Sequence, residues 1–252
     1  MDLFTSDLIS PLFALLLIIL SGVTSFISAA FGAGGGLMLL VVMASVMPMS
    51  VVVPVHGLVQ LGSNTNRLLL SFKHIDKSMF VYFTFGGIAG ALLSSLVMTD
   101  IKLDVMKLIV GIFVIYLLWG KKPVIKTDSM IWRFGAGLVT TFICMFAGAS
   151  GPLVGSCLYV SDYSKLKYTA TFSSIMSVQH LLKAIIYGAV GFSFWQWLPL
   201  ISAMVLSGAV GTWLGIKLLH SMPADKFKRV FKFILTLLAL QLAWQGIGVV
   251  LS

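Results

Sequence analysis

The sequence predicts an all-α polytopic membrane protein built from two inverted repeats, each with about five hydrophobic elements. Hydrophobic residues make up 59% of the 252 residues, and charged residues only 10%. Residues 8–66 contain no Asp, Glu, Lys or Arg, and one bilayer-spanning helix needs roughly 20 apolar residues. A glycine-rich segment runs from Val23 to Leu37 and recurs 116 residues later, from Val139 to Leu153.

The two glycine-rich segments read VTSFISAAFGAGGGL and VTTFICMFAGASGPL, and eight of their fifteen aligned positions are identical. The same offset of 116 residues relates Asn64 to His180 and Arg67 to Lys183. Internal repeats are typical of membrane transporters, whose polar sites lie between the repeats. The repeat therefore predicts a duplicated transporter with a site between its halves.

The hydrophobic pattern predicts ten elements in two repeats, 1–120 and 131–252, joined by a basic cytoplasmic linker at 121–130. The second and seventh elements are too short to span a bilayer, since eleven helical residues reach only about 16 Å. Each follows a glycine-rich turn, so we expect half-helices or re-entrant segments there. The expected elements are 8–31, 36–47, 51–72, 78–99, 103–120, 131–147, 152–161, 168–188, 195–219 and 227–251.

The basic residues predict the topology. The loops at 73–77, 121–133, 165–167 and 217–232 hold 13 of the 17 Lys and Arg residues, and such loops face the cytoplasm. We therefore expect a multi-pass protein of the inner membrane with both termini on its outer, periplasmic side. Because the positive charge of +9 sits in short clusters between apolar spans, nucleic-acid binding is not expected. The N-terminus MDLFTSD lacks a basic region, so we expect no cleaved signal.

Equivalent loops of the two halves carry opposite charge bias. The 73–77 loop is basic, whereas its counterpart at 189–194 has no Lys or Arg; the balanced loop 100–107 corresponds to the basic loop 221–232. Asp104 and Lys107 recur as Asp225 and Lys228, at an offset of 121. The opposite bias predicts an inverted repeat, the arrangement used in alternating access.

Two stripes of polar residues are expected to line the site. Residues three and four apart share a helix face, and polar side chains within a membrane face the bundle interior or a cavity. Alternatively, Arg67 and Lys183 snorkel to the interfaces, His56 caps or packs a helix start near Pro54, and the amides bond neighbouring helices. The stripes consist of His56, Gln60, Ser63, Asn64 and Arg67, and of Ser173, Ser177, His180 and Lys183 with Gln179 adjacent.

Both glycine-rich turns are expected to open a helix N-terminus. Free N–H groups and a partial positive charge favour an anion there, so Gly34, Gly35, Gly36, Ser150 and Gly151 join the predicted binding residues. The eight Asp residues all fall in predicted loops or termini, and there is no Glu. This leaves anion-binding chemistry, with no cofactor and no metal; the two cysteines are expected to pack as free thiols.

One motif points to an alternative. Gly148-Ala149-Ser150-Gly151 matches the GxSG of rhomboid intramembrane proteases, with His180 as the base. However, the counterpart of Ser150 in the first half is Gly34. Because the turn is repeated without the serine, backbone geometry explains it better than a nucleophile does.

The paired glycine-rich turns, strongest at Gly32–Leu37 with the following Pro48, resemble those of the TauE/SafE family of sulfite and organosulfonate exporters, also called the 4-toluene sulfonate uptake permease family. The resemblance covers Leu8–Leu251, although GASGP in the second copy departs from the commoner glycine run. It implies a secondary transporter that exports a small sulfur oxyanion or sulfonate across the lipid bilayer by alternating access. An anion channel, an uptake permease and a homo-oligomeric assembly remain open.

Overall fold

In the computed structural model, the described part of the chain comprises residues 9–31, 34–98, 103–120, 129–159 and 163–218, with positions 233, 236–241, 243–245 and 247. All regular elements in these ranges are helices, which confirms the predicted all-α class. They are α1 (Pro11–Phe31), α2 (Gly35–Val46), α3 (Met49–Leu69), η2 (Phe72–His74), α4 (Lys77–Val97), α5 (Leu103–Trp119), α6 (Met130–Ala147), α7 (Gly151–Tyr159), α8 (Lys165–Ala189), η3 (Trp195–Trp197) and α9 (Leu198–Leu218).

Nine of the ten expected elements appear within a few residues of their predicted bounds. The tenth, at 227–251, lies largely outside the described residues; positions 236–241 and 243–245 are helical. Two expectations were wrong. Helix α5 begins at Leu103, so Asp104 lies in a helix and not in a loop. Pro54 lies inside α3 and does not mark its start, because the helix begins at Met49.

Four helical segments in the described part of the chain are long and apolar enough to cross a membrane: α1, α4, α6, and η3 with α9. The central helices α3 and α8 are long as well, with 21 and 25 residues, but polar side chains make them less apolar. The 12 residues of α2 and the 9 of α7 confirm that these two elements are too short to span. The protein is therefore a multi-pass membrane protein.

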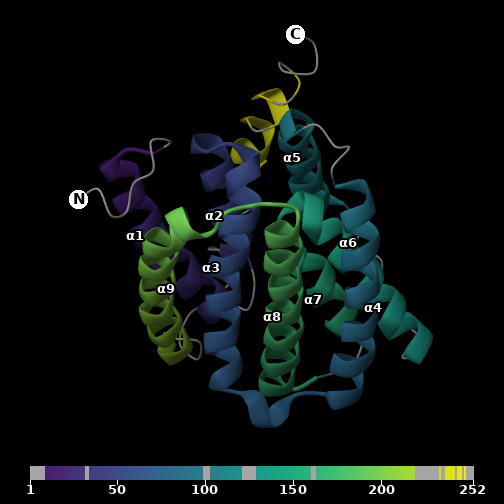
Figure 1. The fold of residues 1–252 in the computed structure, drawn as a ribbon. Coiled ribbons are helices and arrows are strands. Elements are labelled where there is room, and N and C mark those ends of the chain that lie inside the picture. The colour runs from purple at the N-terminus through teal and green to yellow at the C-terminus, as the bar shows by residue number, and fades with distance from the viewer. Residues whose placement is uncertain are drawn as a thin grey trace.

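The helices pack across the boundary between the two halves (Figure 1). Helix α9, from the second half, lies along α1 and also contacts α3, whereas α4, from the first half, lies along α6 and contacts α8. Helices α3 and α8 meet in the centre and run antiparallel, since Gly57 faces Lys183 while Thr65 bonds Ser177. Each group of packed helices thus includes one helix from the other half of the sequence: α9 in the first group and α4 in the second.

Two hydrophobic clusters follow this grouping. The larger one joins mainly side chains of α1, α2, α3, α5 and α9, among them Leu17, Leu40 and Met204, and it also includes Leu153 of α7 and Tyr187 of α8. The second joins α4, α6, α7 and α8 through residues such as Phe83 and Leu158. We call these groups the α1-group (α1, α2, α3, α5 and α9) and the α4-group (α4, α6, α7 and α8). Their main contact is the α3–α8 pair.

Glycines allow the closest helix crossings in both groups. A Cβ added at Gly90 of α4 would lie 2.2 Å from the carbonyl oxygen of Leu138 in α6, and one at Gly211 of α9 would lie 1.9 Å from that of Gly22 in α1. Such approach is possible only without a side chain. Backbone-to-backbone packing therefore fixes α4 on α6 and α9 on α1.

Asp76 ties the corner between α3 and α4 to the start of α8. Its carboxylate caps α4 by accepting the Met79 N–H at 2.9 Å, and it also accepts the Tyr163 hydroxyl at 2.9 Å. Lys167 completes the cluster with an ion pair at 3.0 Å. Partial burial would raise the pKa of Asp76, but the hydrogen bonds from Met79, Lys167 and Tyr163 and the charge of Lys167 outweigh it and lower the pKa to about 2.

Replacing Gly90 with Ala is predicted to destabilise the fold by about 1–3 kcal/mol, because the new methyl group would collide with the α6 backbone. Gly135→Ala in α6 is the matched control: nothing lies within 4 Å of its added Cβ, and alanine favours a helix. Thermal unfolding in detergent measures both. Equal stability of the two variants would contradict the crossing geometry.

Asp76→Asn is predicted to lower the unfolding free energy by about 1 kcal/mol at neutral pH, the difference between charged and neutral hydrogen bonds. Because folding lowers the pKa of Asp76 to about 2, its contribution is complete above the unfolded-state pKa near 4 and disappears as the pH falls through 2. Unfolding measured from pH 7 to pH 2 should show this loss in the wild type but not in Asp76→Asn. Lys167→Gln, which removes only a half-exposed cation, should have a smaller effect.

Candidate functional site

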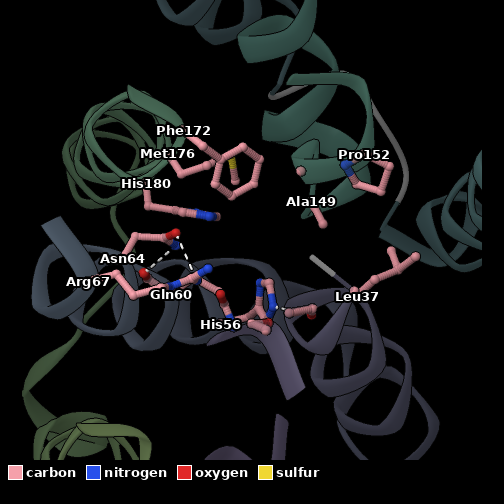
Figure 2. A pocket seen from close by; sticks show the side chains of 14 residues that line it. Leu37, His56, Gln60, Asn64, Arg67, Ala149, Pro152, Phe172, Met176 and His180 are labelled. Atoms are coloured by element: carbon pink, nitrogen blue, oxygen red, sulfur yellow. Dashed lines mark hydrogen bonds between the residues drawn. The ribbon is translucent and has the colours of Figure 1, made fainter. Parts of the chain in front are cut away.

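A cavity lies where α3 and α8 meet the starts of α2 and α7 (Figure 2). The volume open to the centres of water-sized spheres is about 40 Å³. A single water needs roughly 10–15 Å³ by this measure, so a few waters or a small ligand fit. The lining residues are Ser28, Gly34, Gly36, Leu37, His56, Gln60, Asn64, Arg67, Ala149, Gly151, Pro152, Phe172, Met176 and His180.

Helix α3 forms one side of the cavity, which we call the polar wall: His56, Gln60, Asn64 and Arg67. The guanidinium of Arg67 donates from Nη2 to Asn64 Oδ1 at 3.1 Å, and Asn64 Nδ2 donates to the Gln60 carbonyl at 2.8 Å. Arg67 is only 4% exposed, and its Nε has no partner among the described residues. The cation is therefore buried and only partly satisfied.

The opposite side, which we call the apolar wall, is formed by Phe172 and Met176 of α8, each 5% exposed. Figure 2 shows these side chains facing the polar wall, with His180 next to them. The rings of His180 and His56 approach edge to face, with centroids 6.1 Å apart. The Nδ1 atom of each ring is buried without a hydrogen-bond partner in the described structure.

The glycine-rich turns lead into α2 and α7 as predicted. Gly34 has φ of 107° and Gly148 has φ of 77°, a backbone region that favours glycine. Among the described residues, the Met38 N–H donates to Gly34 O at 3.1 Å at the start of α2. Gly36 and Leu37 lie in the first turn of α2, and both residues line the cavity.

Gln179 holds the second turn from behind the cavity. Ser150 Oγ donates to Gln179 Oε1 at 2.6 Å, and Gln179 Nε2 donates to the hydroxyls of Thr140 and Thr141 at 2.9 Å each. One turn further along α8, Lys183 donates to the Gly148 carbonyl at 2.6 Å. These bonds fasten α8 to the end of α6 and the start of α7.

The snorkelling alternative is wrong for both basic residues. Lys183 is fully buried, with its stem against Gly57 of α3, and it lies behind the turn and does not line the cavity. Arg67 is buried and lines the cavity. His56 does not cap a helix start; its Nε2 lies 2.8 Å from the carbonyl oxygen of Gly36.

The cavity lining carries one permanent charge, Arg67, and no carboxylate. Within the described ranges, no cluster of three His, Cys, Asp or Glu side chains is placed to hold a metal ion. The site therefore offers cationic and hydrogen-bonding groups, the chemistry that accommodates an anion.

Eight predicted site residues line the cavity: Gly34, Gly36, His56, Gln60, Asn64, Arg67, Gly151 and His180. Five do not. Gly35 packs against the backbone of Thr24, Ser63 lies 3.2 Å from Ser25 Oγ, and Ser150, Gln179 and Lys183 form the network behind the second turn. The sequence prediction missed Ser28, Leu37, Ala149, Pro152, Phe172 and Met176. The offset of 116 could have found three of these, because it relates Gly36 to Pro152, His56 to Phe172 and Gln60 to Met176.

A family model described as "Sulfite exporter TauE/SafE" matches residues 14–242 of the chain. The chain belongs to the TauE/SafE family. The match spans nearly all described helices, including both glycine-rich turns. Neither the curated proteins nor the solved structures gave a significant match.

TauE/SafE membership makes this a multi-pass protein of a sulfite exporter family. The surroundings of Ser150, the serine of the protease-like motif, are consistent with a transporter family. Ser150 is completely buried, and its hydroxyl donates to Gln179. It lies outside the cavity lining, whereas His180 lines the cavity. In this TauE/SafE protein, the Ser150 hydroxyl links the second glycine-rich turn to α8.

Gln179→Leu is predicted to destabilise the protein by about 2–3 kcal/mol, because three buried hydroxyls would lose their shared partner. Ser150→Ala removes one of these bonds and should cost about 1 kcal/mol. Unfolding of both purified variants in detergent measures the difference. Equal losses would contradict the central place of Gln179 in the network.

Proposed function

We propose that the protein is a secondary transporter that exports a small sulfur-containing anion through this cavity by alternating access. The observation that carries the proposal is the buried guanidinium of Arg67, which faces a cavity whose lining includes no carboxylate. An unpaired charge is costly at membrane depth. A bound anion would compensate it, and family membership supports a sulfur anion such as sulfite or an organosulfonate.

The start of α2 would add neutral donors to the site. Gly36 and Leu37 belong to the first turn of α2, and both line the cavity. Helix N-termini favour anions through free N–H groups and through the helix dipole. The oxyanion would therefore bind between the Arg67 guanidinium and the first turn of α2, with Gln60 and His180 within the same lining. Gly35, Ser63, Ser150, Gln179 and Lys183 would support the site from behind.

The packing supports an inverted repeat formed by residues 1–120 and 131–252. The crossing of Gly90 with Leu138 has its counterpart in Gly211 with Gly22, at the offsets of 121 and 116 found in the sequence. The same offsets relate Gly87 beside Thr141 to Gly208 beside Ser25. Central helices α3 and α8, the proposed counterparts, run antiparallel, as an inverted pair would.

The moving bodies of alternating access would be the α1-group and the α4-group. Each is built mainly around one hydrophobic cluster, although the larger cluster also reaches Leu153 of α7 and Tyr187 of α8. The cavity lies at the α3–α8 contact of the two groups. Packed cores move as units while their interfaces slide or rotate. Motion of one group against the other would open the cavity to one side of the membrane at a time, with the linker 121–130 joining the repeats.

The basic loops support an inner-membrane protein with both termini outside. The Lys167–Asp76 ion pair and the Arg133–Ser78 hydrogen bond bring the starts of α8, α6 and α4 together at one end of the molecule. This end would face the cytoplasm. A membrane potential, negative inside, would then drive anion export, since about 2.3 kcal/mol per charge per 100 mV sustains roughly a 50-fold gradient.

The test is flux of sulfite and of short sulfonates in proteoliposomes, with the membrane potential and the pH gradient set independently. Potential-driven flux is expected in the wild type. Arg67→Gln should raise the half-saturating concentration about 10–150-fold, which corresponds to losing one charged hydrogen-bonding partner of roughly 1.5–3 kcal/mol. Lys217→Gln removes an exposed charge that lies over Trp213, away from the cavity, and serves as the control.

Other outcomes would change the proposal. Flux that follows a proton or sodium gradient and ignores potential would contradict electrogenic export. Macroscopic currents with far higher turnover would identify an anion channel. No flux of any sulfur anion by folded wild-type protein would overturn the transport proposal.

A further inference from the structure

The two walls of the cavity are occupied by residues at matching positions of the two halves. The offset of 116 relates His56 to Phe172, Gln60 to Met176 and Asn64 to His180, and all six residues line the cavity. Only in the last pair, Asn64 and His180, are both residues polar. The halves therefore face each other across the cavity with unlike chemistry: polar on α3 and largely apolar on α8.

The polar wall offers donors at one end of the cavity. The Arg67 Nε is buried without a partner among the described residues, and the Gln60 amide lies beside Gly36, where an added Cβ would be 2.8 Å from Gln60 Oε1. Ligand oxygens placed here would gain charged and neutral hydrogen bonds in place of those that they form with water.

The apolar wall offers no such bonds. The ring of Phe172 covers the first residue of α7, since a Cβ on Gly151 would lie 3.6 Å from the ring carbon Cζ. Pro152, the next residue of α7, has no N–H to donate. Leu37 and Ala149 complete the apolar surroundings. An oxygen facing this wall would lose its bonds to water without replacement.

We propose that this cavity selects a small anion with one oxyanion end and one apolar end, such as a short alkanesulfonate, and that Phe172 and Met176 determine the selectivity. This inference rests on the proposed transport function. The oxyanion end contacts Arg67 and the start of α2, while the alkyl end contacts the apolar wall. A cavity of about 40 Å³ keeps the alkyl end short.

The test compares methanesulfonate with bisulfite in proteoliposomes at mildly acidic pH, where both probes are monoanions. The wild type is expected to prefer methanesulfonate by about 10-fold in half-saturating concentration, the discrimination that one apolar carbon group gives in a fitted pocket. A chain-length series from methanesulfonate to benzenesulfonate should lose affinity once the ligand exceeds the cavity. These two comparisons need no variant.

Met176→Gln installs on α8 the amide that α3 carries at the matching position, Gln60. It should reduce the preference for methanesulfonate about 10-fold by giving a bisulfite oxygen a hydrogen-bonding partner. Met176→Leu, of similar volume and apolar, should keep the wild-type ratio. Phe172→His, which copies His56, is a second variant for the same shift.

Each outcome separates the two proposals. Equal affinity of the wild type for both anions, or a preference for bisulfite, overturns the selectivity inference and leaves transport intact. An unchanged ratio in folded Met176→Gln and Phe172→His overturns the roles of these residues. No flux of either anion through folded wild-type protein overturns the proposed function and this inference with it.

Discussion

The structure depends on placing buried polar groups inside a bundle that lipid surrounds. Helices α3 and α8 carry these groups, among them Arg67, Gln179 and Lys183. Exposure of such side chains to hydrocarbon would cost several kcal/mol each. The two helices therefore pack at the centre of the bundle, with α1, α4, α6 and α9 around them. The cavity lies where the two polar helices meet, because that is where the polar side chains can be turned away from lipid.

Close packing of small residues completes this arrangement. Lipid tails are as apolar as leucine, so helices in a membrane associate through tight contacts more than through the hydrophobic effect. Gly90 and Gly211 bring α4 onto α6 and α9 onto α1 at backbone distance. As a result, each half of the chain contributes a helix to the core of the other. The α1-group and the α4-group are thus units of packing that combine distant segments of sequence.

The two basic residues that the repeat relates have different surroundings. Arg67 faces the cavity, whereas Lys183 donates to the Gly148 carbonyl behind the second turn. A similar difference separates the matching positions Gln60 and Met176. The first half supplies most of the polar side chains that line the cavity. The second half supplies the hydrogen bonds of Gln179, which hold the second glycine-rich turn. The cavity therefore has two chemically distinct sides, which would orient a bound anion.

The amino-acid sequence alone predicts the class of the protein, the bounds of nine helices to within a few residues, both glycine turns and eight of the cavity residues. It could do so because charge-free runs, helical spacing and positive-φ glycines are local properties of the chain. Three features depend on the tertiary structure. Helix α4 packs among helices of the second half and α9 among helices of the first half. Lys183 is buried behind the cavity, and Phe172 and Met176 line it. These depend on which helices lie side by side. An apolar residue on a membrane helix packs equally well against lipid, a neighbouring helix or a ligand, so its type does not reveal which of these it contacts.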